Sequence, residues 1–210
     1  MKEQLAPILF ISGMPGVGKS TIAHNILIKN TNYIIIEEVD IIREALRGYI
    51  NLDSDTFSIS NNDKRIINCA SYELDTEDFF YQCKILQPSI LAICGRLYKK
   101  KIPAIIEGVN LDFISMYQSL KINFSDFLCI NFHISDVKKH HENLLNKYNK
   151  SEKFTSIFED RIIQRGKLCY DRLNDFIYQK PGSKVFNIDL STNTCNPYSN
   201  RQIKQILTCV

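Results

Sequence analysis

The segment from Gly13 to Ser20, GMPGVGKS, constrains the fold of this chain more than any other part of the sequence. It satisfies the pattern G-x-x-x-x-G-K-[ST] in full and lies between a short apolar run and an amphipathic stretch. Glycines at these positions let the backbone turn tightly and aim several N–H groups at one anion. The positive end of the helix that follows favours the same anion. The segment therefore predicts a phosphate-binding loop between a buried strand and a helix.

The same pattern predicts a role for individual side chains. We expect the Lys19 ammonium to contact the β- and γ-phosphate oxygens of a nucleoside triphosphate, ATP or another one, and the Ser20 hydroxyl to bind Mg²⁺. Such a pattern occurs by chance in roughly one chain of this size in a hundred, and the flanking strand and helix argue against chance here. The expected nucleotide-binding residues are Gly13, Pro15, Gly16, Val17, Gly18, Lys19, Ser20 and Thr21.

Short apolar runs alternate with helical patterns along the chain, which favours a parallel sheet with right-handed crossovers. The expected strands are Pro7–Ile11, Tyr33–Ile36, Pro103–Ile106, Phe127–Ile134 and Lys184–Ile188. Helices are expected over Lys19–Asn30, Asp40–Gly48, with Gly48 as the C-cap, and Arg201–Leu207. The sequence thus predicts an α/β, three-layer P-loop NTPase fold with a mostly parallel five-stranded sheet and helices on both faces.

Two stretches interrupt this alternation. Asn51–Lys64 is polar and acidic and reads as a loop within an insertion of about residues 49–100 on the acceptor side. Residues 135–178 are charged and almost wholly helical, longer than one crossover requires, and we expect a helical lid there. The length of 210 residues suits a single domain spanning residues 1–210.

Composition limits the partners. The net charge of +3, from 26 basic and 23 acidic residues, gives no argument for a nucleic-acid partner. The seven cysteines are dispersed, without a C-x-x-C pair, which favours a reducing compartment. No apolar stretch approaches the ~20 residues that span a bilayer, and the first residues lack the pattern of a signal peptide. We therefore expect a cytoplasmic protein that does not contact membranes; the sequence leaves its oligomeric state open.

A carboxylate and two arginines follow the second expected strand, in the stretch DIIREALR. Ligands of open parallel sheets bind at the carboxyl ends of the strands, so Asp40 should lie near the phosphate loop. There it could accept the proton of an attacking hydroxyl or help to hold Mg²⁺. Arg43 and Arg47 share a helix face and could bind an anionic acceptor. The alternative is that Asp40 only caps its helix and the arginines form a solvated face.

Further candidates come from later in the chain. Glu107 ends the strand of PAIIEG, where it could order metal-bound water or bind the acceptor; alternatively it pairs with a lysine. Lys147 lies in the lid region, and Arg161 and Arg165 share a helix face there. Either arginine could act on the transferring phosphoryl group, although surface positions are the default. We expect the adjacent His140 and His141 on the lid surface, not as metal ligands.

The chain lacks the N-K-x-D and D-x-x-G motifs of GTPases and the L-S-G-G-Q motif of ABC proteins. Instead it resembles the 2-phosphoglycerate kinase family of P-loop kinases. The matching stretches are GMPGVGKSTIA, VDIIREALR, the SYE of Ser71–Glu73, Gln82, IPAIIEGVNL, the His140 region and the helix of about residues 158–173. The resemblance implies ATP- and Mg²⁺-dependent transfer of the γ-phosphate to a hydroxyl of a small anionic metabolite.

The sequence also departs from that family. The lid stretch HHENLLNK keeps only Lys147 where the family has several arginines, and Asn110 replaces the histidine of E-G-V-H-L. The Asp-x-x-Arg pair is similar to that of polynucleotide 5′-kinases and of zeta-toxin-like kinases of sugar nucleotides. A polynucleotide or nucleotide-sugar kinase is therefore one alternative. A nucleotide-binding regulatory ATPase without a metabolite acceptor is another.

Overall fold

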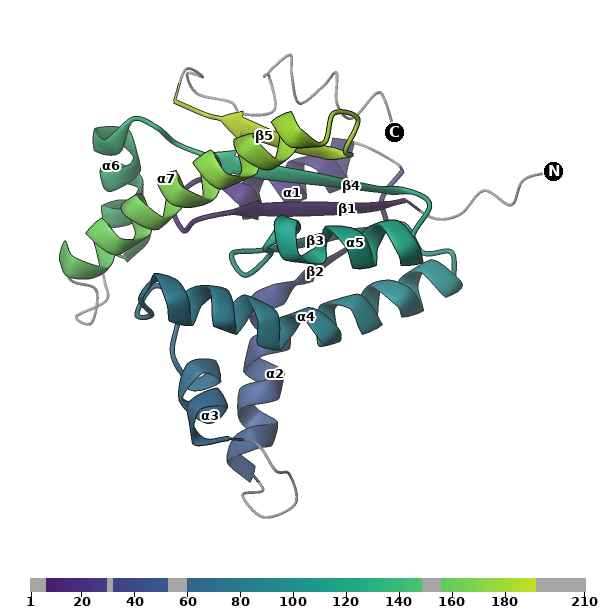
Figure 1. Cartoon of the computed structure of the whole chain (residues 1–210), viewed down its shortest axis with the longest axis horizontal. Coiled ribbons are helices and arrows are strands. Elements are labelled where there is room, and N and C mark those ends of the chain that lie inside the picture. The colour runs from purple at the N-terminus through teal and green to yellow at the C-terminus, as the bar shows by residue number, and fades with distance from the viewer. Residues whose placement is uncertain (1–6, 30–31, 53–59, 149–155, 192–210) are drawn as a thin grey trace.

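A computed structural model describes residues 7–29, 32–52, 60–148 and 156–191 of the chain (Figure 1). Its five described strands form one parallel sheet in the order β2-β3-β1-β4-β5, which confirms the predicted α/β fold. The strands are β1 (Ile8–Gly13), β2 (Ile35–Glu38), β3 (Ala104–Gly108), β4 (Phe127–His133) and β5 (Val185–Asp189). β1, β3 and β4 are buried along their whole length, as a sheet covered on both faces requires.

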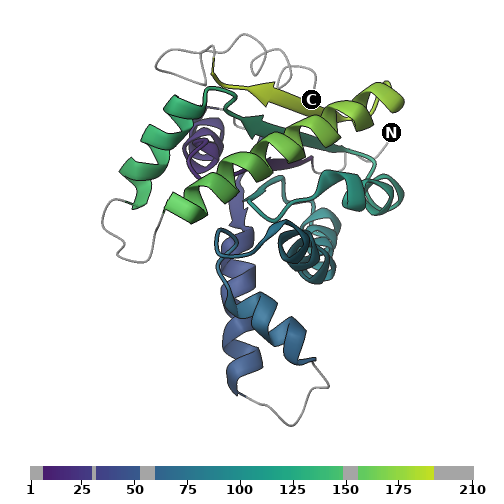
Figure 2. The same ribbon diagram turned by 60° about the vertical axis from the view of Figure 1, so that its left-hand side comes forward.

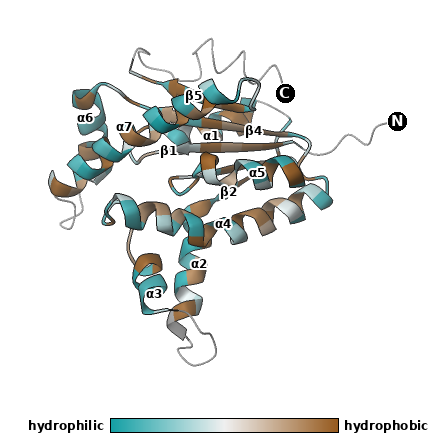
Figure 3. Cartoon of the chain, viewed as in Figure 1, coloured by the Kyte–Doolittle hydropathy of each residue, from teal (hydrophilic) through white to brown (hydrophobic). Residues whose placement is uncertain are grey.

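Helices cover both faces of this sheet. They are α1 (Lys19–Lys29), α2 (Val39–Leu52), α3 (Asn61–Asn68), α4 (Thr76–Lys99), α5 (Phe113–Asn123), α6 (Val137–Tyr148) and α7 (Ser156–Gln179). α1 packs on one face, while α4, α5 and the second half of α7 pack on the other (Figure 1). The central strands are hydrophobic and much of the outer surface of the helices is hydrophilic (Figure 3).

Strand alternation divides the core into two clusters. Leu9 and Ile11 of β1 face α1, whereas Ile8 and Phe10 face α4 and α5. The first cluster continues past the carboxyl edge of the sheet, where the lid helices α6 and α7 join it. The carboxyl edge of the sheet is therefore packed directly against the hydrophobic core.

The second strand lies two residues further along the chain than its hydrophobic pattern predicts. β2 spans Ile35–Glu38 instead of Tyr33–Ile36, and pairs with β3 along its whole length. β2 ends the sheet and its residues are only half-buried, so the charged Glu37 and Glu38 can belong to it. The shift carries Glu38 to the carboxyl edge of the sheet, level with Glu107.

The prediction that Gly48 caps its helix is wrong. α2 continues to Leu52, and Gly48 lies inside it. The expected loop of residues 51–64 is also partly helical, because α3 begins at Asn61 behind the capping side chain of Ser60. Together α2 and α3 project from the body as an arm (Figure 2).

In the described residues, the predicted lid region contains two helices. α6 and α7 occupy most of the predicted residues 135–178, and α7 then returns across the sheet (Figure 2). α5 was not predicted from the sequence. The predicted helix of residues 201–207 lies outside the described residues, as do Cys195 and Cys209. The other five cysteines are free thiols. Within the described ranges, no helix combines the length and the apolar character needed to cross a membrane.

The connection between α3 and α4 is held through its backbone carbonyls. Arg165 of α7 is 2% exposed, and its guanidinium donates to the carbonyls of Ser71, at 2.6 Å, and Leu74. The buried Gln82 donates to the carbonyls of Ile66 and Cys69 at 2.7 and 3.0 Å. Side chains of the body thus fix this connection, residues 69–75, which we call the root of the arm.

A second set of contacts ties this connection to the lid and the sheet. Arg161 Nη1 donates to the Glu73 carbonyl at 2.9 Å. Asn110, which follows β3, donates from Nδ2 to Gln82 Oε1 at 2.8 Å. The amide of Asn110 therefore has a defined partner in the position where the resembled family has histidine.

Replacing Arg165 by alanine should destabilise the fold. The change leaves buried carbonyls without donors and removes the stacking of the guanidinium on Phe79, at 4.5 Å from the ring centroid. We expect a loss of about 3 kcal/mol and a fall in Tm of roughly 6–12 °C. Arg172 provides the matched control, because it stacks on Phe80 at 4.3 Å and has no comparable set of carbonyl contacts in the described part of the chain. Thermal unfolding of both variants gives the comparison, and an Arg172→Ala loss as large as that of Arg165→Ala would contradict this account.

Candidate active site

The loop between β1 and α1 has the backbone that a phosphate cradle needs. Gly13, Gly16 and Gly18 have φ values of 150°, 82° and 85°, which residues with a side chain rarely adopt. A Cβ on Gly16 would also lie 3.0 Å from Leu144 of α6. Within the loop Pro15 and Val17 are buried and Gly18 is exposed. Ser20 and Thr21, in the first turn of α1, are also exposed. The predicted nucleotide-binding residues thus form one continuous loop and the first turn of a helix.

The lysine of the loop is buried. Lys19 is 6% exposed, and burial lowers its pKa. Three carboxylates lie close enough to counter this shift, with Glu107 contributing most, followed by Asp40 and Glu38. The Lys147 ammonium acts in the opposite direction and therefore also lies nearby. The phosphate loop and four separate elements bring these charges together.

Glu107 is the centre of this charge cluster. It is 5% exposed, its Oε1 accepts from Ser20 Oγ at 3.0 Å, and its Oε2 is buried without a hydrogen-bond partner in the described part of the chain. Burial raises its pKa, and the Lys19 charge opposes that shift. The predicted Glu107 therefore lies beside the predicted metal ligand Ser20, on the phosphate side of the site.

Glu38 was not predicted as a site residue. It pairs with Glu107 in the β2–β3 register, so both side chains point to the same face of the sheet. Its charge raises the pKa of Glu107. The signal lay in the sequence, because a carboxylate at the end of β2 meets one at the end of β3. This pairing was missed because the predicted end of the strand lay two residues too early.

Helix α6 is anchored to the phosphate loop. His140 is 0% exposed, and its Nε2 lies 2.8 Å from the carbonyl oxygen of Pro15. Because a carbonyl only accepts, Nε2 carries the proton and donates it. Asn143 Nδ2 donates to the Gly16 carbonyl at 2.9 Å, and Leu144 packs over Gly16. The prediction that His140 lies on the lid surface is wrong, because its ring is covered by the loop.

A cavity of about 430 Å³ opens between the loop and this helix. The loop supplies backbone, one cation and hydroxyl groups, while α6 supplies two amides and a second cation. The lining residues are Gly16, Gly18, Lys19, Ser20, Thr21, Asn143, Asn146 and Lys147. These positions of α6 follow the spacing i, i+3, i+4, which places them on one helix face toward the loop.

The acceptor-side candidates lie on α2. Asp40 is in the first turn and is half-exposed, 3.8 Å from Arg43 Nη2. Arg43 is 9% exposed, donates to Glu44 at 3.3 Å, and has its Nε buried without a partner among the described residues. Arg47 pairs with Glu44 and donates to the Asn68 carbonyl at 3.4 Å. Arg43 therefore lies near the root of the arm, whereas Arg47 braces the arm itself.

The structure separates the three lid candidates. Lys147 is exposed and lines the cavity at the loop. Arg161 is exposed at the start of α7, beside the connection to α4. Arg165 is buried and held by carbonyls, so its place is that of a structural residue and not of a mobile arginine finger.

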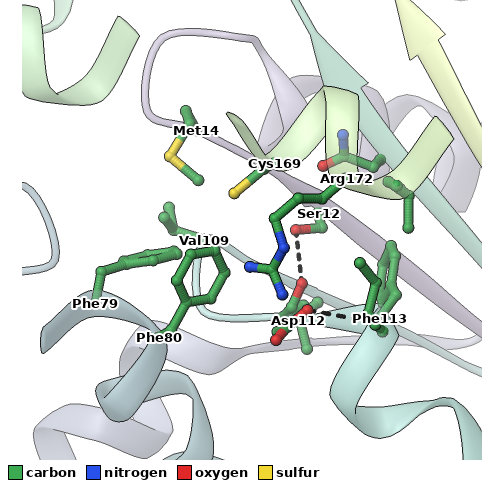
Figure 4. A pocket seen from close by; sticks show the side chains of 13 residues that line it. Ser12, Met14, Phe79, Phe80, Val109, Asp112, Phe113, Cys169 and Arg172 are labelled. Atoms are coloured by element: carbon green, nitrogen blue, oxygen red, sulfur yellow. Dashed lines mark hydrogen bonds between the residues drawn. The ribbon is translucent and has the colours of Figure 1, made fainter. Parts of the chain in front are cut away.

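A second, smaller cavity lies on the other face of the sheet, between α4, α5 and α7 (Figure 4). It encloses about 30 Å³, room for roughly two water molecules. Phe79, Phe80 and Phe113 form much of its wall, and the Arg172 side chain lies across it (Figure 4). A cavity of this size is too small for a nucleotide or a metabolite.

Comparison of the sequence with known protein families gives no match, and comparison with curated proteins gives none either. Solved structures do resemble the chain. The shikimate kinase of Acinetobacter baumannii, solved with shikimate, aligns with a TM-score of 0.51 and 12% identity over 99% of this chain and 96% of that one. The tunicamycin resistance protein of Deinococcus radiodurans aligns with a TM-score of 0.54 and 17% identity over 97% and 95%. The likeness extends over nearly the whole length of each protein, and it shows that this chain shares their fold.

Proposed function

We propose that this chain is an ATP- and Mg²⁺-dependent phosphotransferase that moves the γ-phosphate to a hydroxyl of a small anionic metabolite, with an acceptor like 2-phosphoglycerate. The observation that supports this most is the meeting of Lys19, Ser20, Glu107 and Asp40 at one edge of the sheet. Nucleotide binding alone does not require a half-exposed carboxylate beside the phosphate loop. Transfer to a hydroxyl does, because the hydroxyl proton needs an acceptor.

The residues suit Mg²⁺. This ion prefers hard oxygen ligands and keeps several of its waters. The Ser20 hydroxyl would bind it directly, while the free Oε2 of Glu107 and the Asp40 carboxylate would hold its waters. When bound, the ion would neutralise negative charge on the β- and γ-phosphates.

Each remaining residue has a role in the proposed reaction. The Lys19 ammonium and the loop N–H groups bind the triphosphate, and Lys147 adds a second cation from α6. Asp40 accepts the proton of the acceptor hydroxyl. At the same time the hydroxyl oxygen bonds to the γ-phosphorus, and the bond between the γ-phosphorus and the bridging oxygen of the β-phosphate breaks. Arg43 binds the anionic group of the acceptor. The products are ADP and a phosphorylated acceptor.

A transfer assay with radiolabelled ATP tests the reaction and the acceptor class together. We expect transfer to 2-phosphoglycerate or a related hydroxy acid, and little to a 5′-hydroxyl oligonucleotide. Assays at 50 and 200 mM salt separate the two, because the affinity for a single strand falls by about 0.4 logarithmic units per phosphate contact over this fourfold change in salt. Lys19→Ala is the negative control, with an expected loss of about 3 kcal/mol or more of transition-state stabilisation. Slow ATP hydrolysis that no acceptor changes would instead favour a regulatory ATPase.

Replacing Asp40 by asparagine should separate proton transfer from nucleotide binding. Asparagine keeps the size of the side chain but cannot accept the proton, so turnover should fall by a factor of about 100 to 10,000. The affinity for ATP should change little, because the phosphate loop is untouched. Single-turnover rates and nucleotide Kd values measure the two effects. A parallel loss of both would assign Asp40 to metal or nucleotide binding.

Nucleotide affinity should weaken in acid through His140. Burial lowers the pKa of this ring, and the hydrogen bond to the Pro15 carbonyl and the nearby Glu159 oppose that shift only in part. Its neutral form is therefore favoured in the folded protein, so its contribution to the anchoring of α6 is complete above the ordinary pKa of about 6.5 and is lost as pH falls through the lowered pKa of the buried ring. Protonation keeps the Nε2–H donor but places a charge in a buried site. Protonation would also create an Nδ1–H donor in a buried site without an acceptor.

The variant His140→Gln isolates this effect, because glutamine keeps a donor for the Pro15 carbonyl and does not titrate. Titrations of a fluorescent ATP analogue from pH 7.5 to 5.5 should show weakening that the variant lacks. His133 is also buried. Burial lowers its pKa and the charge of His140 lowers it further, so the two rings lie near each other, and His133→Gln serves as the matched control. Identical pH profiles for the wild type and His140→Gln would contradict this assignment.

A further inference from the structure

An aromatic cluster joins the lid to the root of the arm. Tyr72, in the connection between α3 and α4, contacts Tyr148 at the end of α6, with ring centroids 5.5 Å apart and the ring planes tilted by 59°. It also contacts Phe158 of α7 edge-on at 5.7 Å. These rings come from three separate parts of the chain and meet at the carboxyl edge of the sheet. The lid and the arm are therefore in contact here.

Tyr72 stands on a fixed base. The carbonyl of Ser71, immediately before it, accepts from Arg165, and that of Glu73, immediately after it, accepts from Arg161. The Gln82 contact with the Cys69 carbonyl fixes the same connection. A ring on a backbone held at both sides has little freedom to move away, so Tyr72 provides a rigid surface for Tyr148.

Arg43 faces the same place from α2. Arg47, one turn further out, reaches the Asn68 carbonyl, so the helix face that bears both arginines is turned toward the chain leading to Tyr72. The charge of Arg43 lowers the pKa of both tyrosines, against the larger effect of burial. Burial raises the pKa of Tyr148 to about 12, and Asp40 adds to that increase. Both phenols thus remain protonated donors at neutral pH.

We propose that Arg43, Tyr72 and Tyr148 form the subsite for the anionic group of the acceptor, enclosed between arm and lid, and that this enclosure restricts the acceptor to small molecules. The inference rests on the proposed phosphotransferase function. The guanidinium is a charged donor and each phenol hydroxyl can donate one hydrogen bond, which together match one phosphate or carboxylate group. The neighbouring Asp40 would then meet the hydroxyl of the same molecule.

The contact between the rings of Tyr72 and Tyr148 explains why the size of the acceptor matters. A polynucleotide must leave the site along a continuous path, whereas contact between Tyr72 and Tyr148 closes the gap between arm and lid. An acceptor that fits inside the closed arrangement buries its charge among donors and benefits from the reduced exposure to water. The same two residues would therefore provide both affinity and discrimination by length.

The test measures acceptor binding to the complex with Mg²⁺ and a non-hydrolysable ATP analogue, by calorimetry. The probes are 2-phosphoglycerate, glycerate and a 5′-hydroxyl oligonucleotide. Tyr72→Phe and Tyr148→Phe keep the rings and should each weaken 2-phosphoglycerate binding about fivefold, the usual effect of one lost hydrogen bond. Arg43→Gln should weaken it more, because a charged donor is lost. Tyr148→Ala should reduce the preference for the short probe over the oligonucleotide.

Tyr178→Phe is the matched control, because this tyrosine of α7 is 89% exposed. All variants should bind the ATP analogue like the wild type, which separates acceptor binding from nucleotide binding. Phenylalanine variants that bind 2-phosphoglycerate as well as Tyr178→Phe does would overturn the inference. So would a wild-type complex that binds neither small probe or prefers the oligonucleotide. A wild-type chain that fails to bind the ATP analogue would overturn the proposed function as well.

Discussion

The burial of the Lys19 ammonium beside the Glu107 carboxylate determines how the edge of this sheet is built. A charge in a buried position is costly unless other charges and hydrogen bonds compensate for it. Here the compensation comes from strands that are neighbours in space but distant in sequence, because β3 lies between β2 and β1. The strand order therefore brings Glu38 and Glu107 to the same lysine. A triphosphate would add negative charge to a place that already holds its counter-charges in position.

The order of the strands also explains the division of labour around the site. β1 leads into the phosphate loop, and β2 leads into the arm with Asp40 and Arg43. β3 separates these two strands by one position and supplies Glu107. At the end of β3, Gly108 packs so closely on Val39 that a Cβ would lie 2.5 Å from the Val39 side chain. The absence of a side chain at this position lets the arm start directly beside the loop.

Much of this arrangement could be predicted from sequence, because its signals are local. The phosphate loop is one continuous motif, and the buried strands are short apolar runs between turn residues. The features that were missed depend on contacts between distant segments. His140 reads as a polar residue on a charged helix, and only the Pro15 carbonyl gives it a buried place. Arg165 reads as a surface cation for the same reason, since its carbonyl partners lie about ninety residues earlier. Gly48 was wrongly predicted as a C-cap, because a glycine can also occur inside an exposed helix and does not by itself mark the helix end.

The way the connection between α3 and α4 is held bears on how such a protein can change over time. Arg165, Arg161 and Gln82 recognise backbone carbonyls, and every amino acid carries the same carbonyl. Substitutions at positions of the connection outside the core therefore leave these carbonyl contacts intact, provided that the side chains that hold them persist. Position 72 can accept a different residue without a new fold around it. A chain built in this way could change what it binds beside the phosphate loop by mutation at one or two positions, while the loop itself stays the same.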